Sequence, residues 1–173
     1  MSEAVIGLGS NMGDRNGSLL AAVQALSKLP GTKIRGLSSI YASSPEGAPP
    51  PEDKPDEADE KYHNMVVQAD TQMSPMALLG ACLGIEAAMG RLRNGARSEA
   101  RVIDLDLLVY EGVKSESFEL SLPHPRMLRR AFVLLPLKEL YPAGRAPGIF
   151  FEPYLKELDL TGIVKLEQRI GMQ

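Results

Sequence analysis

Two aspartates stand inside the clearest strand pattern of this chain. Residues 102–110 read Val-Ile-Asp-Leu-Asp-Leu-Leu-Val-Tyr, and the two acids are Asp104 and Asp106. Because side chains alternate between the two faces of a strand, both carboxylates lie on one face, together with Leu108 and Tyr110. The other face is aliphatic and is expected to point toward a core: Ile103, Leu105, Leu107 and Val109. This strand therefore needs a sheet with one covered face and one face that opens on a polar site.

The other apolar patterns place this strand in a β-α-β-β-α-β order. Strands are expected near residues 4–8, 33–44, 62–70 and 101–110. A first helix follows Asp14 or Asn16 as its cap, and a second begins at Ser74-Pro75 and runs to about Arg93. The order is that of the ferredoxin-like α+β fold, in which two helices cover one face of an antiparallel sheet.

The segments after the aspartate strand extend this core. Glu111-Gly112 predicts a tight turn, and residues 114–122 are expected to return as the hairpin partner of the aspartate strand. Residues 128–140 are predicted to be partly helical, with an interruption at Pro136. We therefore expect an antiparallel sheet with helices on its faces and an added hairpin, built as one domain that spans residues 1–173.

Length and composition limit the class of protein. The chain has 173 residues, a formal net charge of −3 and a single cysteine, Cys82. This charge gives no reason to expect binding to nucleic acid or to a membrane surface. No apolar run approaches the roughly 20 residues that a membrane span needs. A single cysteine excludes an internal disulfide, and Cys82 is expected to be a small core residue. These features predict a cytoplasmic monomer.

Residues 45–60 differ in composition from the rest. They contain five prolines and seven acids beside one lysine. Such a segment cannot bury enough apolar surface to fold by itself. Long loops in compact domains are often lids or binding loops, so we expect a mobile loop inside the domain. A surface insertion without a role is the alternative.

The aspartate pair predicts a cation site. Two carboxylates that project side by side repel each other, and a bound cation relieves this repulsion. Magnesium prefers oxygen ligands and is usually held by one or two carboxylates together with substrate phosphates. The alternative for an isolated Asp-x-Asp is a solvated sheet face, so the neighbouring residues decide.

Arginines surround the pair in the sequence. Arg91, Arg93, Arg97 and Arg101 precede it, and Arg126, Arg129 and Arg130 follow it. Arginine makes planar, bidentate contacts with phosphate oxygens, so a cluster of arginines favours phosphate binding. For Arg91 and Arg93, favourable contact with a helix C-terminus is the alternative. His124 lies between two prolines that fix its backbone, and a phosphate contact or a structural hydrogen bond would both fit.

Six segments, in this order along the chain, resemble the 6-hydroxymethyl-7,8-dihydropterin pyrophosphokinase family of folate biosynthesis. They are Gly9-Ser10-Asn11, residues 38–45, Tyr62-His63-Asn64, residues 85–93, residues 101–106, and Pro123-His124 with Arg130-Ala131-Phe132. One such segment would be weak evidence, whereas six at matching spacing cover most of the chain. We therefore identify the chain as a member of this family.

The resemblance implies a reaction and a set of site residues. The hydroxymethyl oxygen of the pterin attacks the β-phosphorus of ATP, a pyrophosphoryl group is transferred, and AMP leaves. Two Mg²⁺ ions are implied on Asp104 and Asp106, and the small-molecule partners are ATP and the pterin. By position, the phosphates would contact Arg91 and Arg101, ATP would be held by Arg93, His124 and Arg130, and the pterin by Ser43, Glu46, Tyr62, Asn64 and Phe132.

Some positions depart from the family pattern. Ser98 and Glu99 stand where an aromatic residue followed by Gly or Ala is usual, and Leu83 and Pro125 replace polar and tyrosine contacts of some members. These departures leave open an inactive member or one of altered specificity. Two further alternatives are a transferase that uses another nucleotide and a ferredoxin-like module that binds a small ligand without chemistry.

Overall fold

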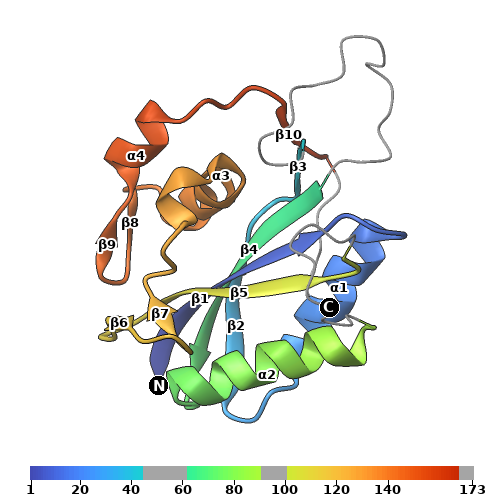
Figure 1. The fold of residues 1–173 in the computed structure, drawn as a ribbon, viewed down its shortest axis with the longest axis vertical. Helices are drawn as coiled ribbons and strands as arrows, with labels where there is room; N and C mark the ends of the chain where they lie inside the picture. The colour runs from blue at the N-terminus through green and yellow to red at the C-terminus, as the bar shows by residue number, and fades with distance from the viewer. Residues whose placement is uncertain (45–61, 91–100, 168–173) are drawn as a thin grey trace.

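The computed structural model describes residues 1–44, 62–90 and 101–167, and its centre is a six-stranded antiparallel sheet (Figure 1). The sheet runs in the order β10-β3-β4-β1-β5, and β2 also pairs with β4. Its strands are β1 (Ser2–Ser10), β2 (Thr32–Leu37), β3 (Tyr41–Ser43), β4 (Tyr62–Thr71), β5 (Asp104–Tyr110) and β10 (Ile163–Lys165). The long strands β1 and β4 pair along their whole length, so they form the middle of the sheet.

Two helices cover one face of the sheet. They are α1 (Arg15–Ser27) and α2 (Pro75–Ala88). The side chain of Asp14 caps α1 by accepting from the Gly17 N–H, and that of Ser74 caps α2 by accepting from the Ala77 N–H. Leucines of both helices pack against the inward residues of β1 in one buried cluster that also contains Cys82. Burial raises the pKa of the Cys82 thiol to about 12, as expected for a core residue.

A second apolar cluster covers part of the other face. It forms under η2 (Met127–Arg129), α3 (Ala131–Leu140) and α4 (Glu152–Glu157), with Phe151 fully buried. The expected interruption at Pro136 is wrong, because α3 continues across this residue. Proline removes one helical hydrogen bond, but Leu134, Pro136 and Leu137 are buried against the sheet, and this packing holds the turn in place.

The predicted alternation of β5 holds only as far as Leu107. Val5 of β1 pairs with Val109, whereas the next residue, Ile6, pairs with Leu107, so Leu108 is an extra residue in a β-bulge. The bulge reverses the alternation. Tyr110 therefore packs in the cluster under α1 and α2, and Val109 joins Leu108 in the cluster under α3. The expectation that Val109 faces the α1–α2 core and Tyr110 faces the aspartate side is wrong for this reason.

The expected hairpin partner of β5 is also wrong. Residues 114–122 instead contain β6 (Ser115–Glu116) and β7 (Ser121–Leu122), which pair with each other in a separate two-stranded sheet. The hydroxyl groups of Ser115 and Ser117 donate to the carbonyl oxygen of Leu120 and hold this small hairpin together. A second two-stranded sheet joins β8 (Arg145–Ala146) to β9 (Ile149–Phe150).

Two further boundaries differ from the predictions. Residues 33–44 form β2 and β3 rather than one strand. At the break between them, the hydroxyl oxygen of Ser38 accepts a hydrogen bond from the Val66 N–H. Helix α2 ends at Ala88, and Gly90 then takes a positive φ of 92°. Arg93 itself and the predicted mobile loop at 45–60 lie outside the described residues. No described helix has the length and apolarity that a membrane crossing requires.

Candidate active site

The register of the sheet brings the predicted aspartates opposite two glycines. Gly9 of β1 pairs with Asp104 on one side and with Asn64 on the other, so these three residues form a row across β4, β1 and β5. Gly7 forms the next row with Asp106 and Val66. Residues in one row share a face of the sheet, so the carboxylates and the Asn64 amide stand on either side of a strip without side chains.

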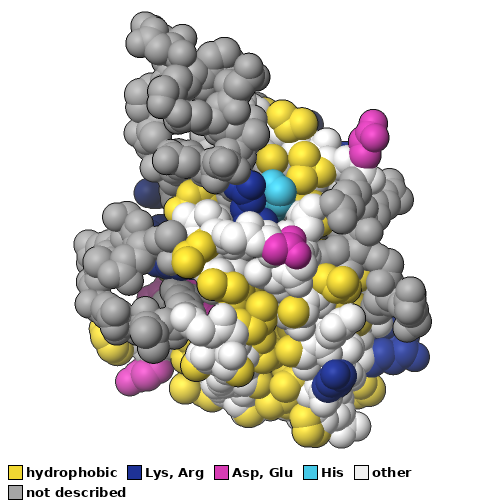
Figure 2. Space-filling view, turned by 90° about the vertical axis from the view of Figure 1, so that its right-hand side faces the viewer, with side chains coloured by type: hydrophobic (Ala, Val, Ile, Leu, Met, Phe, Trp, Pro, Cys, Tyr) yellow, Lys and Arg dark blue, Asp and Glu magenta, His cyan; other side chains and the backbone are white. Residues whose placement is uncertain are grey.

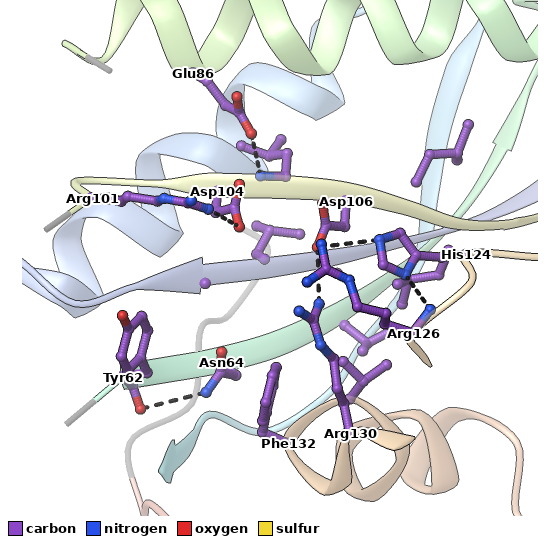
Figure 3. A pocket seen from close by; sticks show the side chains of 18 of the residues that line it. Tyr62, Asn64, Glu86, Arg101, Asp104, Asp106, His124, Arg126, Arg130 and Phe132 are labelled. Atoms are coloured by element: carbon purple, nitrogen blue, oxygen red, sulfur yellow. Dashed lines mark hydrogen bonds and ion pairs between the residues drawn. The ribbon is translucent and has the colours of Figure 1, made fainter. Parts of the chain in front are cut away.

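A cavity of about 990 Å³ lies over this strip. Figure 3 shows its labelled residues: Tyr62, Asn64 and Phe132 lie on one side of β1, Asp104 and Asp106 stand on β5, and His124 lies beyond Asp106. On the face shown in Figure 2, basic side chains lie beside a histidine, with an acidic side chain close to them. The cavity lining combines arginines, which can bind phosphate, with carboxylates, which can bind a cation.

Asp104 lies next to the arginine that precedes the strand. The Nη1 of Arg101 donates to the Oδ2 of Asp104 at 3.0 Å. The backbone at Arg101 is fixed by Asn11, whose Oδ1 accepts from the Arg101 N–H at 2.6 Å and whose N–H donates to the Arg101 carbonyl oxygen at 3.1 Å. Arg101 is thereby held at the edge of the cavity, where its remaining guanidinium donors can meet phosphate oxygens.

Among the described residues, two basic groups lie near Asp106 at longer range. The Nη1 of Arg130 lies 3.7 Å from the Oδ2 of Asp106, and the Nε2 of His124 lies 3.9 Å from the same atom. Both distances exceed a hydrogen bond, so these groups attract the carboxylate without binding it closely. Arg130 also lies over the ring of Phe132, with the guanidinium carbon 5.5 Å from the ring centre. Arg130 thus lies between the Asp106 carboxylate and the Phe132 ring.

His124 is oriented by the backbone. Its N–H donates to the Leu108 carbonyl oxygen at 2.8 Å, and its Nδ1 accepts from the Arg126 N–H at 3.3 Å. Burial lowers the pKa of His124 to about 4, and the nearby charges of Arg130 and Arg126 contribute to the shift. The ring is neutral near pH 7, and because Nδ1 accepts, the proton is on Nε2 and faces Asp106. His124 can therefore donate one hydrogen bond into the cavity.

The other end of the cavity carries an oriented amide. The Nδ2 of Asn64 donates to the Ser43 Oγ at 3.0 Å and makes a longer contact of 3.5 Å with the Tyr62 carbonyl oxygen. Because a carbonyl oxygen only accepts, the amide nitrogen faces Tyr62, and the oxygen of the amide lies over Gly9. Asn64 and Ser43 are both buried, so this arrangement is held by the fold.

Every predicted site residue that the structure describes lines the same cavity. These residues are Ser43, Tyr62, Asn64, Arg101, Asp104, Asp106, His124, Arg130 and Phe132. The other three, Glu46, Arg91 and Arg93, lie outside the described residues. The structure thus brings these nine residues together at one cavity, and the role of each residue stays a prediction.

Sequence reasoning assigned no role to several residues of the cavity. Glu86 of α2 is buried, and its carboxylate accepts the Leu105 N–H at 2.7 Å, directly between the two aspartates. Glu86 follows Leu78 by eight residues and Cys82 by four, and all three lie on the buried face of α2. This helical spacing is a sequence signal that could have revealed Glu86 as a buried residue. Phe118, at the tip of the β6–β7 hairpin, is fully exposed at the cavity rim, and no sequence signal indicated it.

The donor set at the aspartates fits a hard cation. Asp104 and Asp106 project from adjacent rows on one face, and carboxylate oxygens are the ligands that Mg²⁺ prefers. Among residues 1–44, 62–90 and 101–167 there is no group of three or more acidic, histidine or cysteine side chains that could hold a metal alone. A cation here would therefore complete its shell with water or with oxygens of the substrate.

Comparison with known proteins decides the family. The family model described as 7,8-dihydro-6-hydroxymethylpterin-pyrophosphokinase (HPPK) matches residues 5–142. The chain belongs to this family. It is 40% identical over 167 residues to the 2-amino-4-hydroxy-6-hydroxymethyldihydropteridine pyrophosphokinase of Methylorubrum extorquens, which covers 96% of this chain and 100% of that relative. The Bacillus subtilis enzyme of the same name is 38% identical over 169 residues and covers 98% of this chain and 93% of its own length.

Solved structures of the HPPK family share the fold. The crystal structure of wild-type Plasmodium falciparum HPPK-DHPS aligns with a TM-score of 0.63 and 16% identity, over 91% of this chain and 43% of that chain. This chain thus spans less than half of that longer solved protein, and at this identity the likeness shows the fold alone. The family and the enzyme class expected from the sequence are confirmed: the chain is an ATP-dependent pyrophosphokinase.

Proposed function

We propose that the cavity over Gly7 and Gly9 is the place where this enzyme transfers a pyrophosphoryl group from ATP to 6-hydroxymethyl-7,8-dihydropterin, a step of folate biosynthesis. The observation that carries this placement is the row of Asn64, Gly9 and Asp104. In this row, the Asn64 amide can hydrogen-bond the edge of a heterocycle, and the Asp104 carboxylate can hold a cation. Gly9, which has no side chain, lies between them. The two substrates then meet over the strip, with the pterin beside Asn64 and the triphosphate beside the aspartates.

The reaction needs no covalent intermediate with the protein. The hydroxymethyl oxygen of the pterin forms a bond to the β-phosphorus of ATP, the bond from that phosphorus to the bridging oxygen of AMP breaks, and the hydroxyl proton is released. Catalysis of such a transfer depends mainly on positioning and on stabilising charge on the phosphoryl oxygens. The enzyme therefore has to hold two substrates in line and place cations around the moving group.

The described residues fit these two tasks. Arg101 would donate to the transferring phosphates, and Arg130 and the Nε2–H of His124 would hold ATP on the Asp106 side. Asn64 would hydrogen-bond the edge of the pterin, while Phe132 and Tyr62 would lie against its ring and Ser43 would complete the pocket. Arg91, Arg93 and Glu46 keep the roles that the resemblance implies, as predictions.

Magnesium fits this arrangement. Asp104 and Asp106 would hold two Mg²⁺ ions, which would neutralise charge on the β- and γ-phosphate oxygens. Arg101 is paired with Asp104, and Arg130 lies near Asp106. When ATP and cations bind, we expect some guanidinium N–H groups of these arginines to donate to phosphate oxygens instead of to the carboxylates, because phosphate oxygens accept the same donors.

Further aspects of the chain belong to the same proposal. The order β2 and β3, then β4, β1 and β5, supports a ferredoxin-like sheet, since it is the arrangement that a β-α-β-β-α-β chain gives. We infer a single domain over residues 1–173, active as a monomer in the cytoplasm and acting on small molecules rather than on nucleic acid or membranes. The net charge of −3 is consistent with this inference.

The test is to identify the products. The purified enzyme is incubated with magnesium and ATP, with and without 6-hydroxymethyl-7,8-dihydropterin, and nucleotides and pterins are separated and quantified. We expect AMP and the pyrophosphorylated pterin in equal amounts, and only when the pterin is present. Release of ADP, or no AMP from folded protein over a wide range of pterin concentrations, would contradict the proposal and point to Ser98 and Glu99 as marks of altered function.

A further inference from the structure

Gly9 occupies a position where the backbone does not require glycine. It lies inside the central strand β1, paired with Asn64 and with Asp104, and it is not one of the described glycines with a positive φ. Glycine weakens a strand interior, because it loses more conformational freedom than other residues and adds no packing. The reason for glycine here lies in the space above the strand.

That space belongs to the side chain of Asn64. A Cβ atom added at Gly9 would lie 3.1 Å from the Oδ1 of Asn64, which is closer than nine in ten real Cβ contacts. The amide cannot easily withdraw, because its Nδ2 donates to the Ser43 Oγ at 3.0 Å and Asn64 is 7% exposed. A methyl group at Gly9 would therefore push the amide oxygen aside by a few tenths of an ångström and disturb its hydrogen bond to Ser43.

We propose that Gly9 is a specificity-determining residue for the pterin: it leaves the room in which the Asn64 amide lies flat over β1 with its oxygen directed into the cavity. This inference rests on the proposed placement of the pterin beside Asn64. The amide oxygen then acts as the acceptor for a ring N–H of the pterin. Gly9 acts through Asn64, so it is a positioning residue and not a catalytic one.

The neighbouring glycine shows that the effect is specific to this position. A Cβ at Gly7 would meet Cδ1 of Leu108 at 3.3 Å, an apolar contact in the core under α3. Of these two glycines, Gly9 is the one whose added Cβ would meet a polar atom of the cavity. A methyl group at Gly9 should therefore change pterin binding before it changes ATP binding.

Gly36 offers a matched control. It lies on β2 beside the same strand β4, and a Cβ there would meet the Oε1 of Gln68 and the Cδ2 of Leu140, both at 3.1 Å. Gly36 and Gln68 do not line the cavity. Gly36→Ala therefore tests an equally close methyl group in the same sheet, away from the pterin end.

The experiment measures KM for pterin and for ATP, and the Kd of the pterin by titration, in wild type, Gly9→Ala and Gly36→Ala. For Gly9→Ala we expect a KM and a Kd for the pterin raised about tenfold, the loss of one good hydrogen bond, with KM for ATP within about twofold of wild type. Gly36→Ala should leave both pterin constants unchanged. Unchanged pterin constants in Gly9→Ala, or an equal rise for ATP, would overturn the inference.

A double-mutant cycle tests the route through Asn64. Asn64→Ala should itself raise the pterin Kd, and adding Gly9→Ala to it should raise the Kd no further, because the methyl group then meets no amide. An equal additional rise in the Asn64→Ala background would contradict the inference. If Gly9→Ala alone fails to fold, the double variant should fold, and its failure to do so would also contradict it. A wild-type enzyme that forms no AMP with the pterin would refute the proposed function instead.

Discussion

The backbone N–H of Leu105 donates a hydrogen bond to the carboxylate of Glu86 at 2.7 Å, and this bond joins α2 to the strand that carries both aspartates. Glu86 is 2% exposed, so the contact is shielded from water. Since Leu105 stands between Asp104 and Asp106, Glu86 fixes the backbone from which the two carboxylates project. Helix α2 thereby helps to fix the position of the two aspartates.

Glu86→Ala should lower the free energy of unfolding by about 1–3 kcal/mol, because it leaves the buried Leu105 N–H without its acceptor. Urea denaturation of the two proteins measures this difference. Glu86→Gln keeps an acceptor oxygen of the same reach and should recover part of the loss. An alanine variant as stable as wild type would show that the bond does not stabilise the strand.

Another carboxylate, that of Glu139 on α3, gives a prediction about pH. Glu139 accepts from the Ser39 N–H and from the Tyr41 hydroxyl, each at 2.7 Å, and it pairs with Lys165. Burial opposes its ionisation, but Lys165 and the hydrogen bonds from Ser39 and Tyr41 outweigh this and lower the pKa of Glu139 to about 2. A carboxyl whose pKa is lower in the folded state contributes stability above its ordinary pKa and loses it as pH falls.

The ordinary pKa of the group is 4.5, so the window for Glu139 lies between about 4.5 and about 2. Glu139→Gln should therefore be less stable than wild type near neutral pH, and the difference should shrink as pH falls below about 4.5. Urea denaturation at a series of pH values checks this. Lys165→Gln, which removes one partner, should show a smaller effect of the same sign. A stability difference independent of pH would argue against the assigned charge.

Arg130 is predicted to matter for ATP through its planar group and not through its charge alone. Its guanidinium lies near Asp106 and over Phe132, a position that allows two parallel bonds to phosphate. Arg130→Lys keeps the charge but should still weaken magnesium-ATP binding about tenfold, and Arg130→Ala more. Isothermal titration with a non-hydrolysable ATP analogue measures both.

A matched control for this change is Arg35→Lys. Arg35 pairs with Asp70 on the surface of β2 and β4, outside the cavity. The Arg35→Lys variant should bind nucleotide as wild type does. If Arg130→Lys also binds as wild type does, the planar contact proposed for Arg130 is refuted.

Features that depend on neighbouring residues alone were predictable from the sequence, whereas features that depend on pairing between distant strands were not. The aspartate face of β5 was predictable, because alternation over Asp104, Leu105 and Asp106 depends on neighbouring residues only. The bulge at Leu108 was not, since it arises from the register with Val5 and Ile6 of another strand. For the same reason the sequence could not show that the Asn64 amide lies over Gly9, residues 55 positions apart that meet only through the pairing of β1 with β4.

The prediction that residues 114–122 pair with β5 was wrong for a different reason. Its apolar residues, Leu120 and Leu122, pack into the core under α1 and α2. The serines before them close a short turn with their side chains, so the segment folds on itself instead of extending the sheet. Side-chain bonds of this kind compete with strand pairing, and their outcome depends on packing that the sequence pattern does not contain.

The most direct test of the central claim is the rate of pterin-dependent AMP formation in Asp106→Asn, measured over a range of magnesium concentrations. Asn keeps the size of the side chain but removes the charge that would hold the cation, so the account predicts a folded protein whose rate falls at least about a hundredfold and is not restored by magnesium. Asp70→Asn, on the far end of β4, should retain the wild-type rate. An Asp106→Asn enzyme that forms AMP at the wild-type rate would contradict the assignment of this cavity as the site of transfer.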